Sequence, residues 1–87
     1  MLVTFTLSST VDRYEIVTLK GRGGESRYYM SHQGGRLSMK YTTRPSTSEQ
    51  WRIVYYKDKR VAIEGQGSYA GHYIQNYYNS ARLSRGL

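Results

Sequence analysis

Basic and tyrosine side chains alternate along several segments of this 87-residue chain, which has 13 lysines and arginines and 10 tyrosines. Cations bind phosphate groups and aromatic rings stack on bases, so the alternation is compatible with a nucleic-acid-binding surface. On a β-strand, however, the same alternation also arises from ordinary patterning of the two faces. The segments concerned are Arg27–Tyr29, Lys40–Tyr41, Tyr55–Lys57 and Lys59–Arg60.

The net charge of +7 has two explanations. It keeps a small domain soluble, or it attracts an anionic partner such as nucleic acid, an acidic glycan or an acidic protein surface. Nine of the basic residues are arginines, which suit bidentate contact with phosphate or carboxylate and stack on aromatic rings. The candidate anion contacts are Arg22, Arg27, Lys40 and Arg60.

A catalytic function would need a base, an acid and a group that stabilises an anion. Glu64, His72 and Arg60 could serve as base, acid and phosphate clamp. The segment Tyr69–Tyr73 resembles the closing segment of small, basic, tyrosine-rich microbial ribonucleases. Those enzymes begin with helices, whereas this chain begins with a strand pattern at Leu2–Leu7. A ribonuclease-like enzyme is therefore the lesser alternative, and no residue is assigned a catalytic role.

Composition excludes several kinds of site. The chain has no cysteine, which excludes disulfides and thiolate metal sites. Its two histidines lie too far apart in sequence to give zinc-ligand spacing, so we expect neither a metal nor a cofactor. No stretch is long enough to span a membrane, and Met1–Leu7 lacks the basic leader of a secretory signal. Membrane insertion is not expected, and a cytoplasmic location is slightly favoured.

Short alternating segments separated by glycine-rich and polar turns predict an all-β fold. No window shows sustained helical periodicity, and 87 residues are enough for one domain, 1–87. The polar segment Thr42–Ser48, which contains the only proline, is predicted to be a mobile loop. The predicted strands are Leu2–Leu7, Tyr14–Leu19, Arg27–Ser31, Arg36–Tyr41, Trp51–Tyr55, Arg60–Glu64, His72–Asn76 and Ala81–Ser84.

The sequence also repeats itself. Val17–Gly23 is matched 44 residues later by Val61–Gly67. Each copy begins with an aromatic-x-Ile segment, so the two units extend over about 14–41 and 51–84. A repeat of this length indicates one supersecondary unit used more than once. Further matches join Tyr29–Met30 to Tyr73–Ile74 and, after a slip of two residues, Arg36–Ser38 to Arg82–Ser84.

This repeat resembles the β-trefoil unit, in particular that of the hisactophilin and fascin branch. The resemblance rests on Trp51–Ile53 followed by Arg60–Gly65, and on Arg27–Ser38. It implies a small barrel of two trefoil-like repeats plus the N-terminal strand. It also implies binding of a polar or anionic ligand, a glycan or a protein surface, through turns and without a cofactor. The implied ligand-binding residues are Tyr28, His32, Arg36, His72, Asn76, Tyr78 and Arg82.

A trefoil closes with three units, whereas this sequence offers two. Unpaired sheet edges in a two-unit chain invite partners, so we expect a homo-oligomer. A weaker resemblance joins Ser68–Tyr73 to the aromatic-x-Gly turn of βγ-crystallins, which are also two-repeat domains, although the first copy has Glu25–Arg27 in this place. The sequence therefore predicts a non-catalytic binding module, with a nucleic-acid-binding small β-barrel as the alternative.

Overall fold

Seven β-strands and four single-turn 3₁₀ helices make up residues 10–86, the part of the chain that the structure, a computed structural model, describes. The strands are β1 (Val11–Thr18), β2 (Tyr28–Ser31), β3 (Ser38–Tyr41), β4 (Gln50–Tyr56), β5 (Val61–Gly65), β6 (His72–Tyr77) and β7 (Ser80–Arg85). The 3₁₀ helices are η1 (Gly23–Glu25), η2 (Gln33–Gly35), η3 (Thr47–Glu49) and η4 (Gly67–Tyr69). No α-helix occurs within residues 10–86, so the all-β prediction is confirmed.

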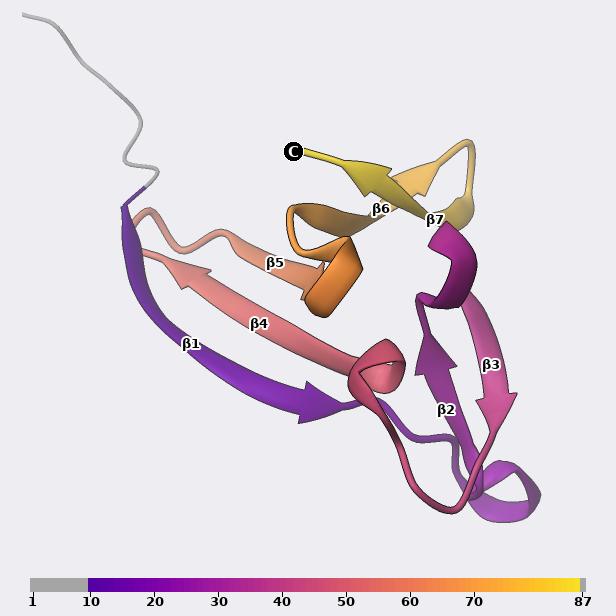
Figure 1. Cartoon of the computed structure of the whole chain (residues 1–87). Coiled ribbons are helices and arrows are strands. Elements are labelled where there is room, and N and C mark those ends of the chain that lie inside the picture. Colours follow the sequence, from indigo (N-terminus) through magenta and orange to yellow (C-terminus); the bar gives the residue numbers. More distant parts are fainter. Residues whose placement is uncertain (1–9, 87) are drawn as a thin grey trace, which may run out of the picture.

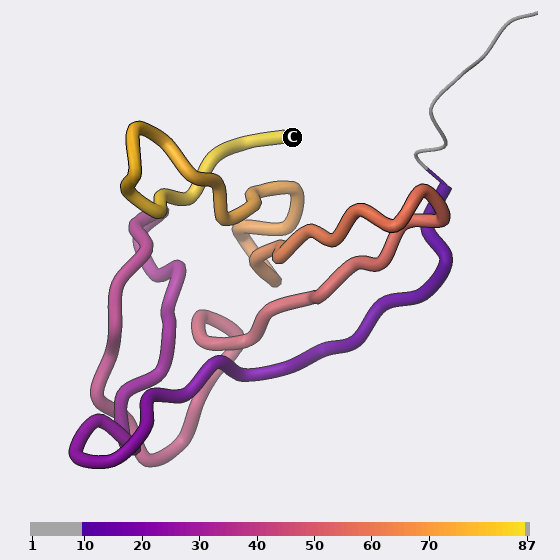
Figure 2. Tube along the Cα trace, turned by 180° about the vertical axis from the view of Figure 1, so that it is seen from behind, coloured from indigo at the N-terminus to yellow at the C-terminus, as the bar shows by residue number. Residues whose placement is uncertain are grey.

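The strands form a five-stranded antiparallel sheet in the order β1-β4-β5-β6-β7 and a separate hairpin of β2 and β3 (Figure 1). Figure 2 shows both hairpins, β2–β3 and β6–β7, on the side of the trace away from the β4–β5 turn. Within the described residues the sheet stays open, with β1 and β7 at its edges, so the predicted barrel is not closed there. The predicted N-terminal strand, Leu2–Leu7, lies outside the described residues.

The same local structure occurs twice, 44 residues apart. Gly23 opens η1 with φ of 62°, and Gly67 opens η4 with the same φ of 62°. This left-handed conformation favours glycine because it has no Cβ. Each turn is followed by a hairpin, β2–β3 after η1 and β6–β7 after η4. One bridge joins each hairpin to the segment before the turn: Lys20, two residues after β1, pairs with Tyr29, and Glu64 of β5 pairs with Tyr73.

The aromatic-x-Ile segments do not occupy equivalent positions in the two units. Tyr14 lies in β1, the same strand as Val17, whereas Trp51 lies in β4, one strand before Val61. The two-residue slip is also absent from the strand pairing. Met39 pairs with Met30, and Leu83 pairs with Ile74, so the hairpins keep the offset of 44.

The core is small and is divided between the two faces of β4, with Trp51 against the end of β2 and the paired residues Val54 and Ala62 on the opposite face. Its buried hydrophobic residues are Trp51, Val54 and Ala62, with 0%, 4% and 8% of their surface exposed. The indole Nε1 of Trp51 donates a hydrogen bond of 2.9 Å to the carbonyl oxygen of Met30, which holds the hairpin against the sheet. A core this limited leaves apolar side chains exposed, among them Val11, Tyr14, Ile16 and Val61.

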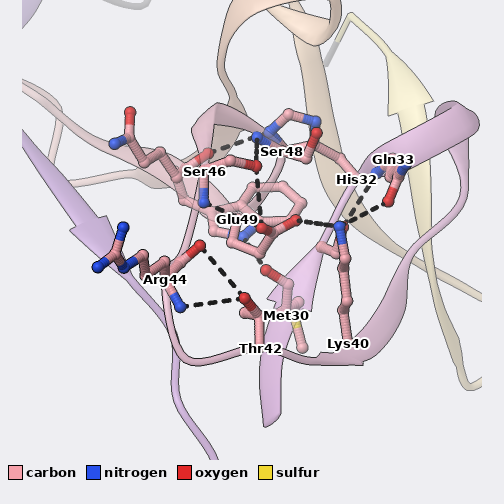
Figure 3. A network of polar contacts seen from close by, with 12 residues as sticks. Met30, His32, Gln33, Lys40, Thr42, Arg44, Ser46, Ser48 and Glu49 are labelled. Atoms are coloured by element: carbon pink, nitrogen blue, oxygen red, sulfur yellow. Dashed lines mark hydrogen bonds and ion pairs between the residues drawn. The ribbon is translucent and has the colours of Figure 1, made fainter. Parts of the chain in front are cut away.

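A buried carboxylate organises the segment that the sequence predicts to be a mobile loop (Figure 3). Glu49 accepts hydrogen bonds from the backbone N–H and the hydroxyl of Ser46. The first of these forms a capping box at η3, because the Ser46 side chain in turn accepts a backbone N–H of the helix. Its other oxygen accepts a hydrogen bond of 2.9 Å from the Ser31 hydroxyl, and Lys40 Nζ lies 3.9 Å away. This network joins β2, β3 and η3 and fixes the end of the loop.

Candidate functional site

Three 3₁₀ turns, η2, η3 and η4, converge on a pocket of about 330 Å³. The turns come from three separate parts of the sequence, so only the folded chain brings them together. No lysine, arginine, aspartate or glutamate lines the pocket, and most of the lining groups are amides, hydroxyls and backbone. The lining residues are His32, Gln33, Gly34, Thr47, Ser48, Gln66, Gly67, Ser68 and Tyr69.

Glycines allow these turns to approach one another. A Cβ on Gly67 would lie 2.8 Å from Cγ2 of Thr47, so only glycine lets η4 pack this closely on η3. A Cβ on Gly35, whose φ is 78°, would lie 3.2 Å from the ring of Tyr69. The pocket wall therefore depends on close backbone contacts as well as on side chains.

His32, a predicted ligand residue, forms the base of this pocket and is only 2% exposed. Its Nε2 lies 3.1 Å from the carbonyl oxygen of Gln50 and 3.2 Å from the backbone N of Gln66. A neutral imidazole nitrogen either donates or accepts, so each tautomer satisfies one of these groups. The ring also meets Trp51 edge-on at 4.9 Å. His32 thus joins β4 to the turn after β5 and has mainly a structural role.

Tyr69 connects the two histidines that the sequence singles out. Its ring lies 5.6 Å from that of His32 and 5.2 Å from that of His72. Nδ1 of each histidine is buried and has no hydrogen-bond partner among residues 10–86. The two histidines therefore belong to one aromatic cluster with Tyr69, which contributes to the pocket wall.

A different group of predicted ligand residues meets at the β6–β7 hairpin. Tyr78 is 86% exposed, and its ring packs edge-on against Tyr77 at 4.5 Å. The Arg82 guanidinium lies 4.2 Å from the centre of the Tyr77 ring, because Arg82 and Tyr77 are diagonal neighbours across the hairpin. Asn76 pairs with Ala81 and so lies on the opposite face of the hairpin from Arg82. Asn76, Tyr78 and Arg82 all lie outside the pocket.

The remaining predicted ligand residues lie apart from both groups. Tyr28 pairs with Tyr41 across the β2–β3 hairpin, and the two rings meet edge-on at 5.5 Å. Tyr28 precedes His32 by four residues, which corresponds to about 13 Å along an extended strand. Arg36 is exposed just after η2. The equivalent positions of the two repeats therefore do not form two similar pockets within residues 10–86.

The four predicted anion contacts are spread over the molecule. Arg22 and Arg27 are exposed near η1, and Arg27 reaches the Tyr41 hydroxyl at 3.5 Å. Lys40 donates a hydrogen bond to Gln33 at 3.0 Å and lies near Glu49. Arg60 pairs with the carboxylate of Asp58 at 2.7 Å. They do not form one continuous basic patch.

The residues of the ribonuclease-like alternative are not assembled either. Glu64 accepts a hydrogen bond of 2.7 Å from the backbone N–H of Gly71, while His72 packs on Tyr69. Arg60 lies just before β5 and four residues before Glu64, which separates their backbones by about 13 Å in an extended segment. A base, an acid and a phosphate clamp made of these side chains would not meet at one reacting group.

Several of the basic side chains contact tyrosine rings of the chain itself. Five cations lie over tyrosine rings in residues 10–86, at 3.8 to 5.9 Å from the ring centres. Pairs of this kind occur about once per 70–80 residues in proteins generally, so this chain is rich in them. The pairs are Arg13–Tyr55, Lys20–Tyr29, Arg52–Tyr14, Arg60–Tyr56 and Arg82–Tyr77.

Sequence reasoning found His32 but assigned no ligand role to the other residues that line the pocket. Two signals point to them: the glycine at position 67, which matches Gly23 in the repeat, and the pattern Ser46-x-x-Glu49, which is typical of a capping box. Residues 10–86 contain no group of three or more histidine or acidic side chains placed to hold a metal ion. They also contain no helix with the length and apolar character needed to cross a bilayer.

No protein-family model, curated protein or solved structure matches this chain.

Proposed function

We propose that this chain is a non-catalytic binding module for a polar ligand, and that the pocket between η2, η3 and η4 holds one sugar unit of a glycan. The observation that carries this proposal is the lining, in which the ring of Tyr69 stands beside amides and hydroxyls and no Lys, Arg, Asp or Glu is present. The volume of about 330 Å³ is at the lower end of the ~300–1,000 Å³ typical of ligand pockets. A small uncharged ligand therefore fits the site best.

The two glutamine amides support recognition of hydroxyl groups. Oε1 of Gln33 accepts a hydrogen bond from Lys40, which leaves its NH₂ group to donate to a ligand. Nε2 of Gln66 donates to the carbonyl oxygen of Gly65 at 2.8 Å, which leaves its Oε1 to accept. The hydroxyls of Ser48 and Ser68 can do either. The pocket therefore offers both donors and acceptors to a sugar, while Tyr69 covers an apolar face of the ring.

The proposed experiment compares two tyrosines in binding titrations with neutral glycans found on an array. Tyr69→Ala should weaken binding at least tenfold, because it removes the aromatic wall, whereas Tyr69→Phe should retain most of the affinity. Tyr78→Ala is the matched control, since Tyr78 is an exposed tyrosine outside the pocket. If Tyr78→Ala abolished binding and Tyr69→Ala did not, the β6–β7 hairpin would be the site instead.

Nucleic-acid binding is the second candidate, and the charge of +7 favours it, although five of the cations lie over tyrosine rings of the chain itself. Its hallmark is an affinity that falls steeply with salt concentration. Tight, salt-sensitive RNA binding with no glycan hit on an array would reverse the order of the two candidates. Binding to a neutral glycan that hardly changes with salt would support the first.

The fold that we propose for this function is trefoil-like, with two units in each chain. Its support is the repetition of strand, turn and hairpin at a constant offset, including the matching bridges Lys20–Tyr29 and Glu64–Tyr73. Two units leave the described sheet open, with β1 and β7 at its edges. A second copy of the chain would cover such an edge, so we include self-association in the proposal.

Strand β1 is the edge that we propose for this association. Within residues 10–86 its outer edge has no strand partner, and Tyr14 and Ile16 are 58% and 49% exposed. Antiparallel pairing of two β1 strands around Tyr14 would place Arg13 of each copy opposite Glu15 of the other. Glu15→Arg should then favour the monomer in sedimentation, and adding Arg13→Glu should restore the dimer. A wild-type chain that sediments as a monomer at all concentrations would exclude this association.

A further inference from the structure

A second pocket, of about 270 Å³, lies on one face of the five-stranded sheet. Strand pairing places its side chains on the same side, since Tyr14 is opposite Val54 in the register, and Glu64 is opposite both Arg52 and Tyr73. Trp51, which packs against His32, follows Gln50 and precedes Arg52 in β4 and so faces the other way. The pocket is lined by Val11, Tyr14, Arg52, Val54, Tyr56, Glu64 and Tyr73.

Arg52 is the unusual group in this pocket. Its guanidinium lies 4.6 Å from the centre of the Tyr14 ring, and its Nε is buried without a hydrogen-bond partner among residues 10–86. Glu64 stands opposite Arg52 in the strand register, yet the two form no ion pair within 4.0 Å. Glu64 instead accepts the backbone N–H of Gly71. The half-buried guanidinium of Arg52 therefore has one buried N–H, that of Nε, without an acceptor among residues 10–86, and buried donors are normally satisfied.

Three tyrosines surround this guanidinium and give the pocket aromatic walls. Tyr14 is 58% exposed, so part of its ring is accessible beside the Arg52 guanidinium. Tyr56 and Tyr73 share a side-chain hydrogen bond. Burial, followed by the nearby charge of Glu64, raises the pKa of Tyr73 above 10.0, so its hydroxyl stays protonated at neutral pH. The walls are thus uncharged and suit the flat or apolar faces of a ring.

We propose that this pocket is a second binding site, which takes a single carboxylate carried on a six-membered ring. The carboxylate accepts the paired N–H groups of Arg52, a geometry that guanidinium and carboxylate share, and the ring lies against Tyr14. The charge of Glu64 offsets part of the attraction between Arg52 and any anion. Contact of the ring with Tyr14 must therefore add to the affinity, and inorganic phosphate, which has no ring, should bind weakly. This site is separate from the glycan pocket proposed above, because the two pockets have no lining residue in common.

The probes that test this site are glucuronate and benzoate, which carry the same carboxylate on a sugar ring and on an aromatic ring. Glucose and inorganic phosphate are the uncharged and the multiply charged comparisons. Titrations followed by NMR or calorimetry should show saturable binding of at least one carboxylate and much weaker binding of glucose and phosphate. The stronger carboxylate identifies the kind of ring. No saturable binding of either carboxylate would overturn the proposal.

Substitutions then locate the site. Arg52→Met should weaken carboxylate binding about tenfold or more, as expected for loss of a charged hydrogen-bonding partner, and Arg52→Lys should give an intermediate loss. Glu64→Gln should strengthen binding severalfold, because it removes a repelling charge while its amide oxygen can still accept the N–H of Gly71. The matched control is Arg13→Met, since Arg13 also lies over a tyrosine ring, that of Tyr55, at 3.8 Å.

Two results would contradict this location. One is equal carboxylate affinity in the wild type and Arg52→Met, and the other is an equal loss in Arg13→Met. If Arg52→Met does not fold, Arg52→Lys and Glu64→Gln test the proposal alone, since opposite changes in affinity are expected from them. Tyr69→Ala should leave carboxylate binding unchanged, so the failure of the glycan proposal and the failure of this one can be told apart.

Discussion

Replacing Glu49 by alanine should destabilise the protein strongly, because Glu49 is 1% exposed and both of its carboxylate oxygens accept hydrogen bonds. One oxygen accepts the backbone N–H and the hydroxyl of Ser46, both at 3.0 Å. The other accepts the hydroxyl of Ser31 at 2.9 Å, and Ser31 is itself 0% exposed. Alanine at this position would leave the Ser31 hydroxyl without its acceptor in a place that water does not reach.

The size of the effect follows from these contacts. Leaving a buried polar group unsatisfied costs about 1–3 kcal/mol, and loss of a capping interaction costs about 1 kcal/mol. The free energy of unfolding should therefore fall by about 2–4 kcal/mol. Small domains unfold with about 5–15 kcal/mol, and the core here has only three buried hydrophobic residues in the described part of the chain. The loss of Glu49 should thus remove a large fraction of the total stability.

The measurement is urea unfolding followed by the fluorescence of Trp51, the only tryptophan, which is fully buried. The matched control is Glu25→Ala. Glu25 is the third residue of η1, as Glu49 is of η3, but it is exposed. The control should change stability by less than about 0.5 kcal/mol. A Glu49→Ala protein that is as stable as the control would refute the reasoning.

Three further outcomes are expected. Burial raises the pKa of Glu49, but hydrogen bonds from two serines and a nearby lysine outweigh this and hold the pKa below 4.5. The stability that the Glu49 carboxylate contributes should therefore be complete above pH 4.5 and decline as the pH falls through the lower pKa of the folded state. Acid titrations of Glu49→Gln should lack this decline. Gly65→Ala should lower the urea midpoint, because its Cβ would lie 2.8 Å from a backbone oxygen, whereas Gly24→Ala has open space and should not. Replacing Tyr78-Asn79 by Asn-Gly should raise the melting temperature, since both residues have positive φ, 47° and 64°.

The positions of the strands could be predicted from the sequence because alternation and turn residues are local signals. The predicted segment Trp51–Tyr55 lies within β4, and the predicted segment Tyr14–Leu19 overlaps β1. The glycine-rich segments predict turns where η1, η2 and η4 lie, but glycine-rich and polar segments do not specify the 3₁₀ form that these turns and η3 adopt. Closure of the sheet could not be predicted because it depends on how many units meet, which no local pattern contains.

The candidate site was predictable only in part, for a related reason. His32 was identified from its place in the repeat, but its burial depends on Trp51 and on the backbone of Gln66, which is 34 residues away. Tyr69 and Arg52 look like ordinary strand or turn residues in the sequence. Their roles depend on which side chains face them in the folded chain, and the strand register, which no local pattern contains, determines those neighbours.

The two copies of the repeated turn show how neighbours turn the same local structure into different surfaces. The two turns begin alike, since Gly23 and Gly67 have the same φ of 62°, but they end differently, with ψ of −10° at Ser26 and 136° at Ala70. A Cβ on Gly67 would meet Thr47 at 2.8 Å, whereas a Cβ on Gly23 would meet nothing within 4 Å. η4 faces η2 and η3 and becomes the wall of a pocket, while η1 has exposed residues throughout. The pocket at η4 therefore depends on the neighbouring turns η2 and η3 and not on the repeated turn alone.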